Sequence, residues 1–175
     1  MNEIIVINKR PMEFPITYPR TLSNGTVCPQ YKIPPAKNGN IIEWKLPFEV
    51  YDWLKNSTTT FLEGYLLVKQ TEENEQQIED IKENNDLMNK AILSEKELMD
   101  IVSTGNQNVF KKKLNELIEN LDDEVQINAV KDYVWSIYTE NGIDSTAKIK
   151  VLCDWVGRDY DKVKDLFDRE NIKLK

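Results

Sequence analysis

The stretch IIEWKLPFEVYDWLKNSTTTFLEGYLLVKQ, residues 41–70, contains three segments that together decide the fold of the first part of the chain. IIEWKL (41–46) and GYLLVK (64–69) are rich in the β-branched, aromatic and other apolar residues that suit strands. Between them, PFEVYDWLKN puts Pro47 at a first helical position, where a missing N–H is tolerated. Phe48, Val50, Tyr51 and Leu54 can then cover one side of this short helix. A short helix between two strands is typical of a small β or α+β domain.

The residues before this stretch extend the same domain to the N-terminus. EIIVI (3–7) predicts another strand, and SNGT (23–26) and KNGN (37–40) carry the Asn-Gly pair of tight turns. All seven prolines lie within the first 47 residues, and proline disfavours helix because it fixes φ and lacks an N–H. We therefore expect a small proline-rich β or α+β domain over residues 1–70.

The next segment, TEENEQQIEDIKENNDLMNK (71–90), is polar and compatible with a helix. Its apolar positions follow the a/d spacing of about two heptads, with Asn85 filling one a position. These apolar residues are Ile78, Ile81, Met88 and Ile92. Two interpretations stay open for residues 71–92. The segment is either a solvated linker helix that rests on its own domain, or a short helix through which the chain self-associates or binds a partner.

Residues 93–175 predict a helical bundle. SEKE (94–97) has the form of a capping box, and Gly105, Gly142 and Gly157 stand where helices would end. The apolar residues between these points repeat at helical spacing. They include Leu98, Ile101 and Val102; Phe110, Leu114, Leu117, Ile118 and Leu121; and Val130, Tyr133, Val134, Ile137 and Tyr138. We expect five or six helices after residue 70, the last five forming the bundle, and hence an α+β protein in which a small β domain precedes an acidic all-α helical bundle.

The formal charge of −7 is unevenly distributed. Residues 1–70 carry 8 basic and 6 acidic side chains, whereas residues 71–175 carry 15 and 24. A net-acidic second part does not suit a polyanionic partner, because affinity for phosphates depends largely on Lys and Arg. The charge pattern therefore favours a protein partner over nucleic acid.

Several kinds of chemistry are excluded by composition. The chain has no histidine, which removes Ser-His-Asp and Cys-His catalysis and His-ligated metal sites. It has no Walker loop, no GxGxxG and no CxxC spacing, so we expect no catalytic residue, no cofactor and no metal site. Cys28 and Cys153 are interpreted as two unrelated buried thiols, with a single disulfide as the alternative. No stretch of 18 apolar residues would span a membrane, and we expect no signal peptide.

The stretch KIKVLCDWVGRDYDKVKDLF (148–167) has the outline of a DNA-reading helix-turn-helix, with its turn at Gly157. The would-be recognition helix, residues 158–170, has a net charge of −1 and carries Asp159 and Asp161 at its N-terminal end. Carboxylates at that end of a recognition helix would meet phosphate repulsion, but they suit the positive end of a helix dipole. We therefore expect a structural hairpin or a protein-binding surface. The triplet Lys111–Lys113 is interpreted as a solvated face, with an anion contact as the alternative.

Aromatic and apolar side chains supply the candidates for partner binding, since aromatic residues are enriched at protein interfaces. The four tryptophans are interpreted first as core residues, with anchors at a protein interface as the alternative. The six candidates for partner binding are Trp53, Ile78, Ile81, Met88, Trp135 and Trp155.

Residues 41–70 resemble segments of uncharacterised structural proteins of tailed bacteriophages. In those proteins a small β domain ends in a P-x-E-V-Y-x-W-L helix and an F-x-x-G-x-L-x-V strand, followed by an acidic helical tail. The matching residues are Pro47, Glu49, Val50, Tyr51, Trp53 and Leu54, then Phe61, Gly64, Leu66 and Val68. The resemblance implies a virion or virion-assembly component and carries over no catalytic or ligand-binding position.

The sequence thus favours a non-enzymatic bacteriophage structural or assembly protein that acts through protein–protein contacts. Its partners would be other virion or phage proteins, or a second copy in a homo-oligomer, in the virion or in the host cytoplasm. The alternative is a phage-encoded regulator or inhibitor of a host protein, either an acidic decoy or a helix-turn-helix protein. An enzyme is the least favoured class.

Overall fold

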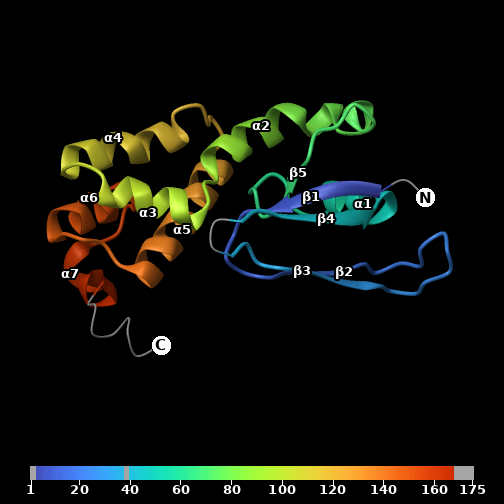
Figure 1. The fold of residues 1–175 in the computed structure, drawn as a ribbon, viewed down its shortest axis with the longest axis horizontal. Coiled ribbons are helices and arrows are strands. Elements are labelled where there is room, and N and C mark those ends of the chain that lie inside the picture. The colour runs from blue at the N-terminus through green and yellow to red at the C-terminus, as the bar shows by residue number, and fades with distance from the viewer. Residues whose placement is uncertain (1–2, 38–39, 168–175) are drawn as a thin grey trace. The chain divides into compact units, whose positions relative to one another are not determined.

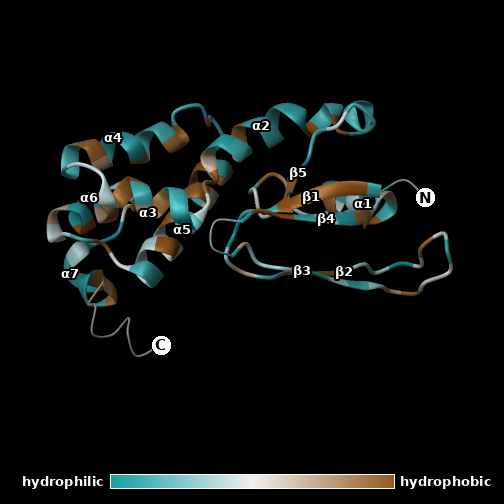
Figure 2. Cartoon of the chain, viewed as in Figure 1, coloured by the Kyte–Doolittle hydropathy of each residue, from teal (hydrophilic) through white to brown (hydrophobic). Residues whose placement is uncertain are grey.

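The computed structural model describes residues 3–37 and 40–167, which form two compact units divided between Lys90 and Ala91 (Figure 1). The first unit contains the strands and the second is helical, so the predicted α+β class is confirmed. Figure 2 shows that β1 is mostly hydrophobic and α2 mostly hydrophilic. No helix in the described ranges has the length and apolar character needed to cross a membrane.

The first unit is built on a three-stranded antiparallel sheet in the order β4-β1-β5. The central strand β1 (Glu3–Asn8) pairs with β4 (Ile42–Pro47) on one side and with β5 (Leu67–Val68) on the other. Alternate residues of a strand face opposite sides, and accordingly Ile4 and Val6 are fully buried while Ile5 and Ile7 are half-buried.

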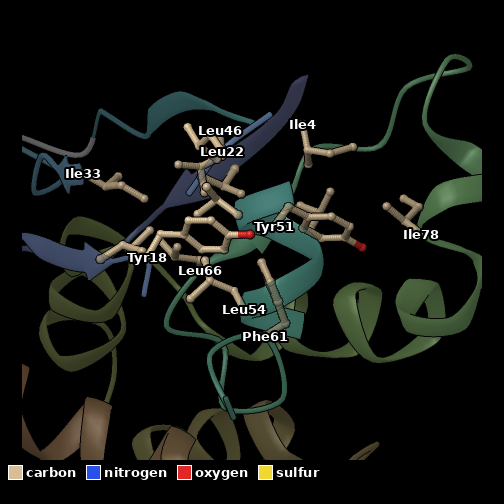
Figure 3. Close-up of a cluster of buried hydrophobic side chains, with 14 residues drawn as sticks. Ile4, Tyr18, Leu22, Ile33, Leu46, Tyr51, Leu54, Phe61, Leu66 and Ile78 are labelled. Carbon is tan, nitrogen blue, oxygen red and sulfur yellow. The ribbon is translucent and has the colours of Figure 1, made fainter. Parts of the chain in front are cut away.

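Helix α1 (Phe48–Ser57) follows β4 directly and buries the side predicted from its sequence, with Val50, Tyr51 and Leu54 in the core. Its residues meet Ile4 and Leu46 of the sheet in one apolar cluster (Figure 3). Pro47 is the last residue of β4 and the N-cap of α1, whereas the sequence predicted it to be the first residue of the helix.

A hairpin of β2 (Phe14–Thr17) and β3 (Gln30–Ile33) forms a separate two-stranded sheet, whose Ile16 and Ile33 join the same core. The predicted turn at Asn24-Gly25 is confirmed: Gly25 has φ of +87°, and the Leu22 N–H donates to the Thr26 carbonyl over 2.9 Å. The second predicted turn lies partly outside the described residues, because only its ends, Lys37 and Asn40, are placed; they form an isolated bridge.

Strand β5 is shorter than predicted, since only Leu67 and Val68 of residues 64–69 form the strand. The backbone N–H groups of Tyr65 and Leu66 both donate to the Thr60 carbonyl, after a bend at Gly64 with φ of +63°. Because these two N–H groups bind within the loop, they cannot form hydrogen bonds with β1.

The predicted continuous helix over residues 71–92 is also different in the structure. Two short 3₁₀ turns, Glu75–Gln77 and Glu79–Ile81, precede helix α2 (Lys82–Ala91). The cause is Asn74, which is buried: its side chain accepts from the Thr71 N–H and donates to the Lys69 carbonyl, both within 2.9 Å. A side chain that binds nearby backbone groups in this way stabilises a turn in place of a helix.

The second unit consists of packed helices, as predicted. They are α3 (Glu95–Ser103), α4 (Gln107–Ile118), α5 (Glu124–Asn141), α6 (Thr146–Val156) and α7 (Tyr160–Val163), followed by a 3₁₀ turn at Lys164–Phe167. The capping box at Ser94 and Glu97 is formed, and Gly142 and Gly157 end their helices with positive φ. The predicted stripes supply the core, although Ile101 and Ile118 are only half-buried.

The last helix is much shorter than the predicted span of 158–170. Helix α7 has four residues before the chain tightens into the 3₁₀ turn, and residues 168–170 lie outside the described part. Phe167 is buried, but Leu166, predicted to cover the same face, is 51% exposed. The tighter winding of a 3₁₀ turn separates positions that an α-helix would align.

Candidate protein-binding surfaces

The two edges of the three-stranded sheet differ in how their backbone groups are used. At the β5 edge, the side chain of Asn85 in α2 accepts from the Val68 N–H over 2.7 Å and donates to the Val68 carbonyl over 3.0 Å. Asn85 is 3% exposed. Its amide therefore occupies the place that another strand would take, and it closes this edge.

The β4 edge is open. The Lys69 N–H donates to the Ile5 carbonyl over 2.9 Å, so Ile5 directs its backbone groups to β5, and its neighbours Ile4 and Val6 direct theirs to β4. Their partners on β4 are Leu46 and Trp44. It follows that Glu43 and Lys45, which alternate with them, direct their N–H and C=O groups away from the sheet.

No other strand in the described ranges pairs with β4 on that side. We call the outward backbone groups of Glu43 and Lys45, with the side chains of residues 42–46, the β4 edge. Unpaired N–H and C=O groups in a row are a template for another strand.

The side chains of the β4 edge alternate in character. Glu43 and Lys45 are exposed and lie on the sheet face away from the core, whereas Ile42 and Trp44 are half-buried. Glu43 pairs with Lys69 over 2.8 Å, and Lys45 lies 3.7 Å from Glu3. Exposed pairs of this kind contribute little to stability, so these charges can serve recognition.

In the second unit the structure brings Trp135 and Trp155 to one seam between α5 and α6. The Arg158 guanidinium lies 4.4 Å from the centre of the Trp135 ring, and the Lys131 ammonium lies 5.6 Å from that of Trp155. Arg158 also contacts Asp132 over 3.4 Å. Helix α5 thus supplies Trp135 and Lys131, whereas α6 supplies Trp155 and the residue after its Gly157 cap supplies the guanidinium.

This seam is mainly internal. Trp135 is 7% exposed and packs edge-on against Phe167, with ring centres 5.4 Å apart. Trp155 is half-buried, and its indole Nε1 is buried without a hydrogen-bond partner. These contacts place Trp135 in the core of the unit and leave only part of Trp155 accessible.

The candidates in the first unit also contact their own chain. Ile78 belongs to the core cluster, and Trp53 and Ile81 pack against that cluster, Trp53 edge-on to Tyr18. Ile78 and Met88 have no exposed surface. Ile78 and Met88 are therefore used in packing within the chain, and a partner-binding role for the six candidate residues stays a prediction.

Several basic residues of the second unit contact nearby groups. Lys148 is 4% exposed and donates to the Val102 carbonyl over 2.6 Å and to Asp144 over 2.9 Å. Lys113 lies 2.8 Å from Glu116, and this hydrogen bond lowers the pKa of the Glu116 carboxyl. The hollow beside Lys111 and Lys112 is also lined by Glu116 and Glu119, so its charge is mixed.

Both cysteines are free thiols. Cys153 is buried, as predicted, and burial raises the pKa of its thiol. The prediction of burial is wrong for Cys28, which is exposed in the hairpin loop, where its φ of +43° is unusual for a residue with a side chain. Within the described ranges, no three His, Cys, Asp or Glu side chains are grouped so that they could hold a metal ion.

Residues 2–86 match the family model described as the YonA N-terminal domain. The matched segment contains the strands β1–β5, helix α1 and the side chain that closes the β5 edge. YonA is a phage-type protein name, and the match suggests a phage-associated protein. No curated protein and no solved structure matches the chain.

Proposed function

We propose that the chain is a non-enzymatic bacteriophage structural or virion-assembly protein that acts through protein–protein contacts. The observation that carries this proposal is the open β4 edge, which lies within the segment that matches the phage-type family model. Strand addition at such an edge supplies main-chain hydrogen bonds to a partner, while the side chains on either side select it.

The charge distribution supports a protein partner. The chain has a net charge of −7, and Lys113, Lys148 and Arg158 lie beside carboxylates of their own unit. A nucleic-acid site would need basic side chains left available to phosphates.

The shape of the C-terminal hairpin also argues against the helix-turn-helix alternative. A recognition helix must lie along the major groove and present several side chains to base edges. Helix α7 has only four residues, with Asp159 as its N-cap and Asp161 in its first turn. We therefore favour the structural role over a helix-turn-helix regulator.

The test is the composition of particles from cells infected by the phage that encodes this chain. Mass spectrometry of purified virions and of assembly intermediates is expected to detect the protein in a fixed ratio to the major virion proteins. Absence from both kinds of particle, together with salt-sensitive binding to DNA or recovery on a host enzyme, would contradict the proposal.

A further inference from the structure

We propose that the β4 edge pairs in antiparallel fashion with the β4 edge of a second copy of this chain, with Trp44 of each copy on the two-fold axis. This inference rests on the proposed role in protein contacts and names the occupant of the open edge. The sequence around the axis, Glu43-Trp44-Lys45, carries opposite charges at equal distances from its centre.

The backbone fits this register. In an antiparallel pair centred on Trp44, Glu43 of one copy lies opposite Lys45 of the other, and the reverse pair forms on the other side of the axis. Glu43 and Lys45 are also the residues whose N–H and C=O groups point outward from β4. The two opposed pairs therefore become the hydrogen-bonded pairs of the new ladder, with four backbone hydrogen bonds expected from the geometry.

The side-chain charges select the same register. With Trp44 at the centre, each Glu43 carboxylate faces a Lys45 ammonium of the second copy. A shift that centres the pair on Glu43 puts two carboxylates opposite each other, and the shift to Lys45 puts two ammonium groups there. Opposite charges across strands are favourable and like charges are unfavourable, so the neighbouring registers are disfavoured.

The other face of the strand supplies an aromatic contact. Trp44 is half-buried and lies on the core face of the sheet. At the axis it would occupy a non-hydrogen-bonded position, where opposed side chains come closest. The two Trp44 rings can then pack against each other, an arrangement that adds to the stability of strand pairs.

The closed β5 edge limits the assembly to two copies. Asn85 occupies both backbone groups of Val68, so the three-stranded sheet of each copy offers only its β4 edge for pairing. The product is a six-stranded sheet in the order β5-β1-β4-β4-β1-β5. An isologous contact of this kind closes on itself and does not propagate into a fibre.

Sedimentation equilibrium of the full chain tests the inference, because the contact joins identical surfaces. We expect a reversible monomer–dimer equilibrium in the wild-type protein. Glu43→Lys and Lys45→Glu should each weaken dimerisation about tenfold, since either change places two like-charged pairs across the axis. The double variant Glu43→Lys/Lys45→Glu restores both opposite pairs and should return the dissociation constant to within about threefold of the wild-type value. Lys111→Glu is the control for a charge change on an exposed helix of the second unit.

A chain that stays monomeric up to about 1 mM would overturn the inference, because a dissociation constant above that concentration means that the two edges bind only very weakly. A dimer that neither single variant weakens, or that the double variant does not restore, would also overturn it. These outcomes are separate from the test of function. A monomer found in virions would contradict the pairing alone, whereas a dimer missing from every particle would contradict the structural role alone.

Discussion

At the scale of single residues, two buried tyrosines show how the same side chain can be well or poorly accommodated. The Tyr138 hydroxyl donates to the Leu98 carbonyl over 2.8 Å in the second unit. The Tyr51 hydroxyl in the first unit is buried without a partner, although its ring packs against Phe48 and Phe61. An unmade buried hydrogen bond is costly, whereas a made one contributes modestly.

Replacing each tyrosine by phenylalanine should therefore give opposite results. Tyr51→Phe removes an unpaired hydroxyl and should leave stability unchanged or raise it by up to about 1 kcal/mol. Tyr138→Phe leaves the Leu98 carbonyl unpaired and should lower stability by about 1–2 kcal/mol. Urea unfolding of the two variants measures both effects, and a larger loss for Tyr51→Phe than for Tyr138→Phe would show that this account of the two hydroxyls is wrong.

The same tyrosines predict a loss of stability in alkali. Burial raises the pKa of both phenols well above the ordinary value. As pH rises through about 10, the unfolded chain releases protons that the folded chain retains, so the free energy of unfolding falls. The double variant Tyr51→Phe/Tyr138→Phe should lose less stability than the wild type between about pH 8 and about pH 10.5. Equal losses in the two proteins, measured by urea unfolding at both pH values, would contradict this explanation.

At the scale of elements, Asn85 decides that the β5 edge is closed. It joins two segments 17 residues apart, since its amide binds both backbone groups of Val68 from α2. Asn85→Ala leaves these two groups buried and unpaired and should cost about 2–3 kcal/mol. Asn89→Ala, on an exposed position of the same helix, is the matched control and should change stability by less than about 0.5 kcal/mol.

Hydrogen exchange provides the second measurement for this element. The Val68 amide should exchange much faster in Asn85→Ala than in the wild type, because its acceptor is lost. An unchanged rate at Val68, or a loss of stability no larger than that of Asn89→Ala, would show that Asn85 is not what closes the edge.

Elements fixed by nearby residues were predictable from the sequence. The capping box at Ser94, the Asn24-Gly25 turn and the helix end at Gly142 depend on residues within a few positions of one another. The prediction of a continuous helix over residues 71–92 was wrong. The polar composition of the segment suits a helix, but the Asn74 side chain binds nearby backbone groups and stabilises a turn.

At the scale of the whole molecule, the α+β class followed from the sequence because prolines and β-branched residues precede a proline-free run of amphipathic helices. The order of strands did not follow. IIEWKL predicts a strand, but its place at an edge depends on which strands pair with EIIVI from across the unit. The charges at Glu43 and Lys45 were visible in the sequence, and only the sheet shows that their backbone groups point outward.

The two units also separate the two kinds of candidate surface. The tryptophans of the helical unit are mostly used in its own packing, so they leave little area for a partner. Within the described residues, the three-stranded sheet retains one unpaired edge, β4, and this sheet lies within the segment matched by the family model. We therefore propose that the sheet unit, rather than the helical unit, recognises a partner.

Amide hydrogen exchange followed by NMR at several protein concentrations tests the use of the β4 edge most directly. The Glu43 and Lys45 amides, which point outward, should exchange quickly in dilute protein and become protected as the concentration rises. The Trp44 and Leu46 amides, which face β1, should be protected throughout and serve as internal controls. Exchange at Glu43 and Lys45 that stays the same at every concentration would contradict the account.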